Sequence, residues 1–491
     1  MARPWLRRID GSIGRSFAND FYYRIRIIER KIDVGSVAGS VASQFHVWNA
    51  FFNVRNLAQI IETDTEGLSL SGPASGDFQG LQWQLYDLAI VIDGPSDIEA
   101  IFEWDFGADS ALLEVVGTRV IVIHFPALDN ISETLEWRTD VLKAFATESR
   151  RGVRQTPTQA IDYSVHVVAG ERQQLEKSLE RQTAAFGVPI WYEAQTVPSI
   201  TAGAVTIDVD TTVSDYRVNG LLFIFKDTAN FESATITGIS DTQITLKGAT
   251  GNSYTAAQVM PMRIAYIASA NIDRLHIDNN IVNMSFVVRE YAAIAAGAFT
   301  QYEGSDVLLD PTVTLRSQKV SINQSRQWLD NGIGGMKPRR NESRSRILDS
   351  HEWVTSTIAD KWVLRQWLFS RAGQRNAFYV PTFQNDYRLI SSFAALDTSI
   401  QVSTSGEVAP FDIFVKLQDG STFLRRITQV VPDAILAQEA WTFAVGFGVD
   451  VAVADIRLFS RVRFMRQTAD RVELKHSAPL ITQLNVPLTT V

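Results

Sequence analysis

The chain has 491 residues, of which 45% are hydrophobic and 20% charged, and its formal net charge is −8. These values predict a globular protein with room for about three domains, and they argue against nucleic acid as the main partner because phosphate-binding proteins usually carry a basic stripe. The absence of cysteine excludes disulfide frameworks, thiolate metal sites and cysteine nucleophiles.

Neither a signal peptide nor a membrane span is predicted. The first ten residues are basic, but no apolar run of signal-peptide length follows them. No segment reaches the roughly 20 apolar residues that cross a bilayer. We therefore expect synthesis in the cytoplasm and no membrane span.

Residues 1–129 are predicted to form an N-terminal β domain. Apolar and polar side chains alternate over 81–85, and after Gly94-Pro95 the apolar residues again recur at every second position. The inward face there is predicted to carry Ile98, Ala100, Phe102 and Trp104. A strand pair is expected at 111–116 and 119–125, with the turn at Gly117.

Residues 130–310 are predicted to form a first helix-plus-β module. Leu135, Leu142 and Phe145 fall near helical spacing, and Asn130 with Glu133 could cap that helix. A second helix is expected over 171–186, ended by Gly187 and Pro189. The predicted strands are 163–168, 205–209, 221–226, 233–239, 243–246 and 262–267.

Residues 311–350 read as a connector with an Arg-rich loop. The stretch 331–346 combines glycine and proline with basic residues, so we expect a mobile loop or an arm that orders against a partner. The candidate partner-contact residues are Arg339, Arg340, Arg344 and Arg346. They could grip an acidic neighbour, a phosphorylated surface glycan or a passing DNA end, or they could simply keep a solvated loop soluble.

Residues 351–491 are predicted to form a second helix-plus-β module, because one pattern occurs twice. Its helix is expected over 352–370. Residues 187–191 correspond to 378–383, 236–244 align with 427–435 without a gap, and 270–275 correspond to 469–474 with a small shift. The predicted fold class is therefore mainly β with a few helices, with an N-terminal β domain followed by two duplicated helix-plus-β modules.

No catalytic, cofactor or metal site is assigned. The glycine-rich stretch before Lys337 lacks the Ser or Thr of a phosphate loop. Asp208, Asp210 and Asp215 could suggest calcium, but alternation along a strand explains them more simply. The six histidines lack metal-ligand spacing: they are His46, His124, His166, His276, His351 and His476. We expect no enzymatic activity, although carboxylate pairs are too common for sequence to exclude a glycosidase.

Tryptophans gather in the helix predicted over 352–370. Trp353, Trp362 and Trp367 are not spaced as one helical stripe. Core packing on more than one side is the favoured interpretation, and a carbohydrate-stacking platform is the alternative.

Six further parts of the chain carry a recognisable pattern: 137–141, 148–154, Tyr163, 188–191, 370–378 and 380–383. Together they resemble the tail-tip and baseplate proteins, distal tail or hub-like, of long-tailed bacteriophages and gene transfer agents. The resemblance implies a β-rich structural virion protein, made in the host cytoplasm and located at the tail tip. It would join the tail tube to receptor-binding or fibre components, with the tail tube and other tail-tip proteins as partners and no dedicated nucleic-acid site.

Such proteins form rings, so further copies of the chain, as a trimer or hexamer, are expected partners. A trimer of a two-module chain presents six similar surfaces and could match sixfold to threefold symmetry. Two other hypotheses stay open: a host-binding adhesin or tail fibre protein, and a cell-envelope-degrading enzyme.

Overall fold

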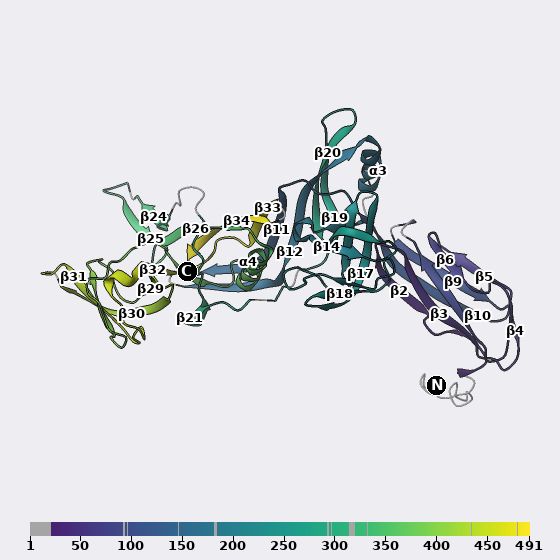
Figure 1. Ribbon diagram of the computed structural model, residues 1–491. Coiled ribbons are helices and arrows are strands. Elements are labelled where there is room, and N and C mark those ends of the chain that lie inside the picture. Colours follow the sequence, from purple (N-terminus) through teal and green to yellow (C-terminus); the bar gives the residue numbers. More distant parts are fainter. Residues whose placement is uncertain are drawn as a thin grey trace, which may run out of the picture. The chain divides into compact units, whose positions relative to one another are not determined.

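The computed structural model is mainly β, with two α-helices in the part of the chain that it describes (Figure 1). The structure describes residues 21–91, 94–95, 97–145, 147–180, 184–291, 294–295, 297–313, 320–330, 332–433, 435–478 and 480–491. Contacts divide it into two compact units, Met1–Asp129 with Ile161–Glu290, and Asn130–Ala160 with Tyr291–Val491. Neither helix in these ranges is long and apolar enough to cross a membrane.

The N-terminal strands belong to the first unit. They are β1 (Ile25–Ile27), β2 (Lys31–Val37), β3 (Val41–Asn49), β4 (Arg55–Leu57), β5 (Gln59–Thr63), β6 (Leu68–Ser71), β7 (Gly76–Phe78), β8 (Trp83–Ile90), β9 (Asp97–Asp105) and β10 (Ser110–Val122). One sheet has the order β1-β3-β8-β6, while β5, β9, β10 and β2 pair in a second.

The two sheets share one hydrophobic core. The predicted inward face of β9 is confirmed, since Ile98, Ala100, Phe102 and Trp104 are all buried. The Trp104 ring meets Phe45 of β3 edge to face, with ring centroids 5.6 Å apart. Aromatic side chains therefore fill the space between the sheets.

The predicted strand pair around Gly117 is wrong. Residues 110–122 form the single strand β10, which has a β-bulge between Val116 and Gly117 instead of a turn. A Cβ on Gly117 would lie 2.5 Å from a Val34 methyl carbon, so glycine at this position allows β10 to approach β2 closely.

The remaining elements of the first unit begin with one long strand, residues 148–168. Residues 148–160 of this strand belong to the second unit, and residues 161–168 belong to the first. Its elements are β12 (Glu148–Val168), α3 (Ala169–Leu179), β13 (Ala185–Pro189), the 3₁₀ turn η1 (Trp191–Glu193), β14 (Gln195–Ile200), β15 (Thr206–Asp208), β16 (Leu221–Asp227), β17 (Asn230–Ser240), β18 (Gln243–Leu246), β19 (Tyr254–Arg274) and β20 (Asn279–Val288).

The second unit is also strand-rich. Its elements are β11 (Ile131–Lys143), β21 (Gln301–Tyr302), β22 (Ser305–Asp306), β23 (Ser321–Asn323), β24 (Arg326–Leu329), β25 (Lys337–Arg340), β26 (Arg346–Thr355), α4 (Ile358–Arg371), β27 (Phe378–Pro381), β28 (Ser399–Ser403), β29 (Phe411–Leu417), β30 (Thr422–Asp433), β31 (Gln438–Phe443), η2 (Val453–Asp455), β32 (Ile456–Gln467), β33 (Arg471–Ala478) and β34 (Ile481–Thr490).

Strand pairing follows the same order after each helix. In the first unit β13 pairs with β19, β16 with both β17 and β19, and β19 with β20. In the second unit β27 pairs with β32, β29 with both β30 and β32, and β32 with β34. The strand after each helix also has a parallel partner, through Val122 and Gly187 in one unit and Val307 and Tyr379 in the other.

The gap-free alignment of 236–244 with 427–435 falls on matching β-bulges. In β17 the register shifts between Ile236 and Gly238, and in β30 it shifts between Ile427 and Gln429. Both isoleucines are fully buried. In both strands, therefore, a buried isoleucine precedes a β-bulge that inserts one residue more than the partner strand has.

The correspondence of 270–275 with 469–474 is strand against strand for most of its length. Residues 270–274 continue β19, which pairs with β20, and residues 471–474 begin β33, which pairs with β34. Only residues 469–470 lie in the turn between β32 and β33.

The predicted helix near Leu135 and Phe145 is wrong, because residues 131–143 form β11, which pairs with β33. Inward side chains recur at every second residue from Ile131 to Trp137, but Glu133 is one of them. Its polar side chain breaks the apolar alternation from which a strand is predicted. Asn130 and Glu133 do not cap a helix.

The other helices are shorter than predicted. Helix α3 ends at Leu179, and the end of the expected span, residues 185–186, begins β13, while 181–183 lie outside the described residues. Helix α4 begins after Thr357, whose hydroxyl accepts a hydrogen bond from the Asp360 amide. Trp353 therefore lies in β26. Core packing is confirmed for Trp353 and Trp367, which are buried, whereas Trp362 is only partly buried.

His351 is buried in β26 against the Trp353 ring, with ring centroids 4.0 Å apart. Burial lowers its pKa to about 3. Because the unfolded chain binds a proton near pH 6.5 while the folded chain does not, stability falls as the pH drops below 6.5 toward 3. This histidine makes the second unit sensitive to acid.

We expect the variant His351→Phe to lose less stability than the parent between pH 7 and pH 5, by about 2 kcal/mol. Urea denaturation at both pH values measures the difference. His276→Phe, at an exposed turn, is the matched control. Identical pH dependence in the parent and His351→Phe would contradict the assignment.

Candidate partner-contact site

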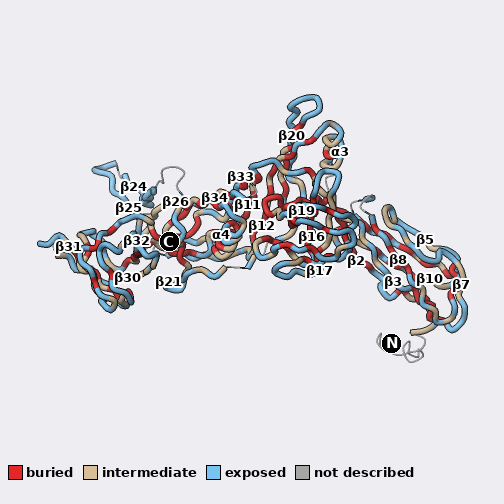
Figure 2. The backbone as a smooth tube through the Cα atoms, viewed as in Figure 1, coloured by how far each residue is buried: buried red, intermediate tan, exposed pale blue. Residues whose placement is uncertain are grey.

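A two-stranded hairpin lies within the predicted connector, residues 311–350. β24 pairs with β25 through four residue pairs, and all eight residues are exposed (Figure 2). Within the stretch 331–346, residues 337–340 are therefore a paired strand and not a loop, and Asn331 lies outside the described residues. Arg339 and Arg340 end the second strand.

Each face of this hairpin combines cations with apolar groups. Arg326 lies directly opposite Arg340, and Trp328 lies opposite Pro338 on the same face. Trp328 is 60% exposed, and Ile333 and Met336 in the connecting segment are exposed as well. Like charges placed opposite one another weaken a hairpin, so an acidic partner would relieve the repulsion.

Arg344 and Arg346 lie in a different place, at a pocket of about 360 Å³. Its walls come from the turn that joins β11 to β12, the stretch 342–346, Phe464 of β32 and the last residues of the chain. Arg346 is not free: its Nε lies 2.6 Å from Glu342 Oε2 and its Nη1 lies 3.2 Å from Glu148 Oε2. The structure thus separates the four predicted arginines into two pairs.

Glu148 organises the pocket wall. Its two oxygens accept hydrogen bonds from Nε and Nη2 of the buried Arg466, at 2.5 and 3.0 Å, in addition to the contact with Arg346. Burial alone would raise the pKa of Glu148, but Arg466 and then Arg346 outweigh it and lower the pKa. The Arg150 guanidinium is a third neighbour, with Nε 3.8 Å from Glu148 Oε1. A carboxylate surrounded by guanidinium groups in this way is a rigid support and has little basicity for acid–base chemistry.

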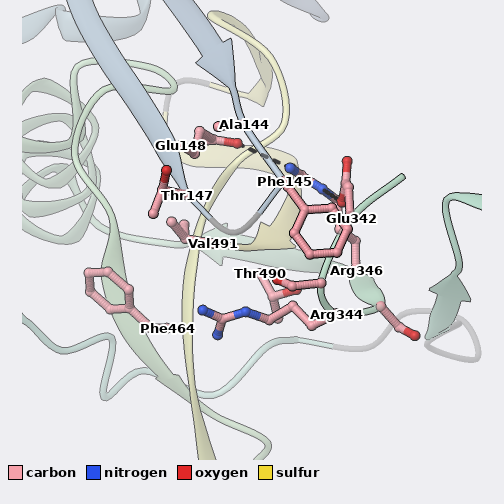
Figure 3. Close-up of a pocket in the computed structure, with 12 residues that line it drawn as sticks. Ala144, Phe145, Thr147, Glu148, Glu342, Arg344, Arg346, Phe464, Thr490 and Val491 are labelled. Atoms are coloured by element: carbon pink, nitrogen blue, oxygen red, sulfur yellow. Dashed lines mark hydrogen bonds and ion pairs between the residues drawn. The ribbon is translucent and has the colours of Figure 1, made fainter. Parts of the chain in front are cut away.

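Arg344 is the cation that this pocket offers to a ligand. Figure 3 shows its guanidinium pointing toward Phe464, away from the Glu148–Arg346 contact. Within the described residues no hydrogen bond or ion pair engages its side chain. An unpaired guanidinium beside an aromatic ring suits a carboxylate from a partner.

A second pocket of about 600 Å³ lies on the same unit and shares Phe464. Arg150, Arg371 and Arg375 line it, and Arg371 is paired with Asp306. The Arg371 guanidinium also lies over the Trp367 ring, 4.5 Å from its centroid. Both pockets are therefore lined by arginines, of which Arg150, Arg346 and Arg371 contact carboxylates of the same unit.

Each unit contains a buried network of charged side chains. In the second unit, Glu133 Oε1 accepts hydrogen bonds from Gln159 Nε2 at 2.6 Å and Arg365 Nη2 at 2.7 Å. Burial would raise the Glu133 pKa, but Arg365, His476 and Gln159 outweigh burial and lower the pKa to about 2. Sequence reasoning gave Glu133 a capping role because its partner Arg365 is far away in the chain.

Two arginines occupy matching positions in the two units. Arg263 pairs in register with Val188, and Arg463 pairs with Val380. Their acidic partners differ: Arg263 Nη2 lies 2.8 Å from Asp215 Oδ2, whereas Arg463 Nη1 lies 4.0 Å from Asp349 Oδ2. Asp215, considered above as a calcium ligand, is thus part of an ion pair.

The described residues contain no group of three or more His, Asp or Glu side chains that could hold a metal ion. In comparisons with known proteins, no family model and no curated protein matches this chain.

Proposed function

We propose that this chain is a structural virion protein of a phage tail tip or baseplate, which joins the tail tube to receptor-binding or fibre components. The observation that carries the proposal is the repeated order of strand pairing after α3 and α4, with matching bulges at Ile236 and Ile427. We interpret these segments as duplicated helix-plus-β modules that follow the N-terminal β domain.

Repetition of this kind gives one chain two similar surfaces. A closed ring of such chains would present twice as many equivalent surfaces as it has subunits, which suits a junction between assemblies of different symmetry. The proposed ring is a trimer or hexamer at the virion tail tip, and its neighbours are the tail tube and other tail-tip proteins.

The β24–β25 hairpin is the proposed contact between subunits. An isolated two-stranded hairpin is marginally stable in water, and this one buries none of its strand residues. Its cations and the exposed Trp328 match a partner that carries acidic and apolar groups. Arg344 and Arg375 provide further cations on the same unit.

Negative-stain electron microscopy tests the proposal on the purified chain and on particles labelled with an antibody against it. We expect rings in solution and label at the tail tip. Monomers together with label elsewhere on the particle, or on no particle, would contradict the proposed function.

The double variant Arg339→Glu/Arg340→Glu should weaken ring formation by about tenfold or more, because it places carboxylates where an acidic partner is expected. Light scattering over a concentration series measures the association. Arg388→Glu/Arg457→Glu changes the net charge equally at other exposed positions and serves as the control. Equal association of the two double variants would eliminate the hairpin as the contact.

A further inference from the structure

An aromatic platform lies on the outward face of the sheet β1-β3-β8-β6. Trp48 and Trp83 are directly opposite each other on β3 and β8, and their rings stack with centroids 4.9 Å apart and planes 5° apart. Trp48 is buried, and its Nε1 donates a hydrogen bond to the Leu81 carbonyl at 3.3 Å. Trp83, supported on one side by Trp48, is 47% exposed.

Further rings surround this pair. Phe21 and Tyr22 contact Trp48 edge to face, and Phe52 lies against Tyr22 with centroids 5.1 Å apart. Phe52 is exposed in spite of these contacts. The surrounding rings hold Trp48 in place, so the orientation of the Trp83 ring is fixed before any ligand arrives.

Hydrogen-bonding groups continue the same face along the strands. His46 lies opposite Leu85, two residues along each strand from the tryptophan pair. Gln44 lies opposite Asp87, two residues farther along. Gln44 Nε2 donates to Asp87 Oδ1 at 2.6 Å, which leaves the second Asp87 oxygen and the Gln44 carbonyl oxygen as acceptors. On the neighbouring strand β6, the exposed Ser71 lies opposite Asp87.

We propose that this face binds an oligosaccharide, with one sugar ring stacked on Trp83 and the next hydroxyl groups bound by Gln44 and Asp87. A pyranose has an apolar C–H face and a rim of hydroxyl groups. The electron-rich face of an indole packs against the C–H face of the sugar, and carboxylate and amide groups hydrogen-bond to its hydroxyl groups. Trp83 also offers its ring Nε1–H, for which no protein acceptor exists in the described part of the chain.

The inference goes beyond the proposed function, since a tail-tip protein can assemble without binding sugar. It also differs from the platform considered for Trp353 and Trp367, whose rings are buried. The exposed tryptophan of the hairpin, Trp328, lacks a stacked ring beneath it among the described residues, so it provides a matched comparison.

The test uses the full chain and a microarray of bacterial capsular and O-antigen polysaccharides, followed by fluorescence titration with fragments of the polysaccharide that binds. We expect at least one polysaccharide to bind. Trp83→Ala should weaken that binding by about tenfold or more, Asp87→Ala should also weaken it, and Trp83→Tyr should retain part of it. Trp328→Ala should bind as the parent does.

Circular dichroism of each variant separates lost binding from lost folding, and Trp83→Tyr gives a second folded variant. No binding by the folded parent, or undiminished binding by folded Trp83→Ala, would overturn the assignment. A larger loss in Trp328→Ala than in Trp83→Ala would overturn it too, because it would move the contact to the hairpin. Ring formation by Trp83→Ala should equal that of the parent.

Discussion

Replacing Glu133 by glutamine should lower the free energy of unfolding of the second unit by about 3–5 kcal/mol, the cost of breaking a buried ion pair. The side chains of Glu133 and Arg365 are almost completely excluded from solvent, so the variant would leave the Arg365 charge without its counter-ion. His476, whose Nε2 lies 3.4 Å from Glu133 Oε2, would lose the same neighbour. Denaturation in urea, followed by tryptophan fluorescence, measures the change.

Protonation of the same carboxylate should lower the stability of the second unit in acid. Its pKa is lowered to about 2 in the folded chain, below the ordinary value of 4.5. Its contribution to stability is therefore complete above pH 4.5 and is lost as the pH falls toward 2. Glu133→Gln should show a flatter pH dependence than the parent over that window.

Glu136→Gln is the control, because Glu136 lies on the same strand with an exposed side chain. We expect a change within about 0.5 kcal/mol for this surface substitution. If Glu133→Gln were as mild as Glu136→Gln, the network around Glu133 would not contribute as proposed.

The second large effect is expected at Gly373, in the turn after α4. Its φ is +65°, and a Cβ there would lie 2.4 Å from Asp470 Oδ1. That oxygen accepts a hydrogen bond from the Gln374 amide at 2.9 Å, so it cannot move without losing the contact. Gly373→Ala should lower the free energy of unfolding by about 2–4 kcal/mol, because it strains the backbone and displaces Asp470.

Gly304→Ala separates the two causes. Gly304 has a similar φ of +74°, but nothing lies within 4 Å of its added Cβ. Gly304→Ala should therefore lower the free energy of unfolding only through backbone strain, by about 1–2 kcal/mol. Equal losses in the two variants, measured by urea denaturation, would show that Asp470 does not resist the substitution.

Local patterns predicted those parts of the fold in which burial and periodicity agree. The alternation over β9 is apolar at each buried position, so its inward face follows directly from sequence. The strand β11 was missed because the buried residue Glu133 is charged, and its partner Arg365 lies 232 positions later. No window of local sequence contains that pairing.

The candidate site was only partly accessible from sequence. Composition drew attention to four arginines, but it could not show that Arg346 contacts Glu148 or that Arg339 belongs to a paired strand. The platform at Trp83 was not predicted. Its signal, tryptophans on adjacent strands, depends on the register between β3 and β8, which long-range pairing sets.

The different acidic partners of Arg263 and Arg463 have a consequence for folding. A chain with two similar β segments risks pairing a strand of one with strands of the other, as repeat proteins do when they misassemble. A β19 strand placed where β32 belongs would separate Arg263 from Asp215 and bring it to the position of Arg463, whose acidic neighbour Asp349 lies farther away, at 4.0 Å. The closer ion pair of Arg263 therefore forms only in the correct strand pairing, which disfavours exchange of the two strands.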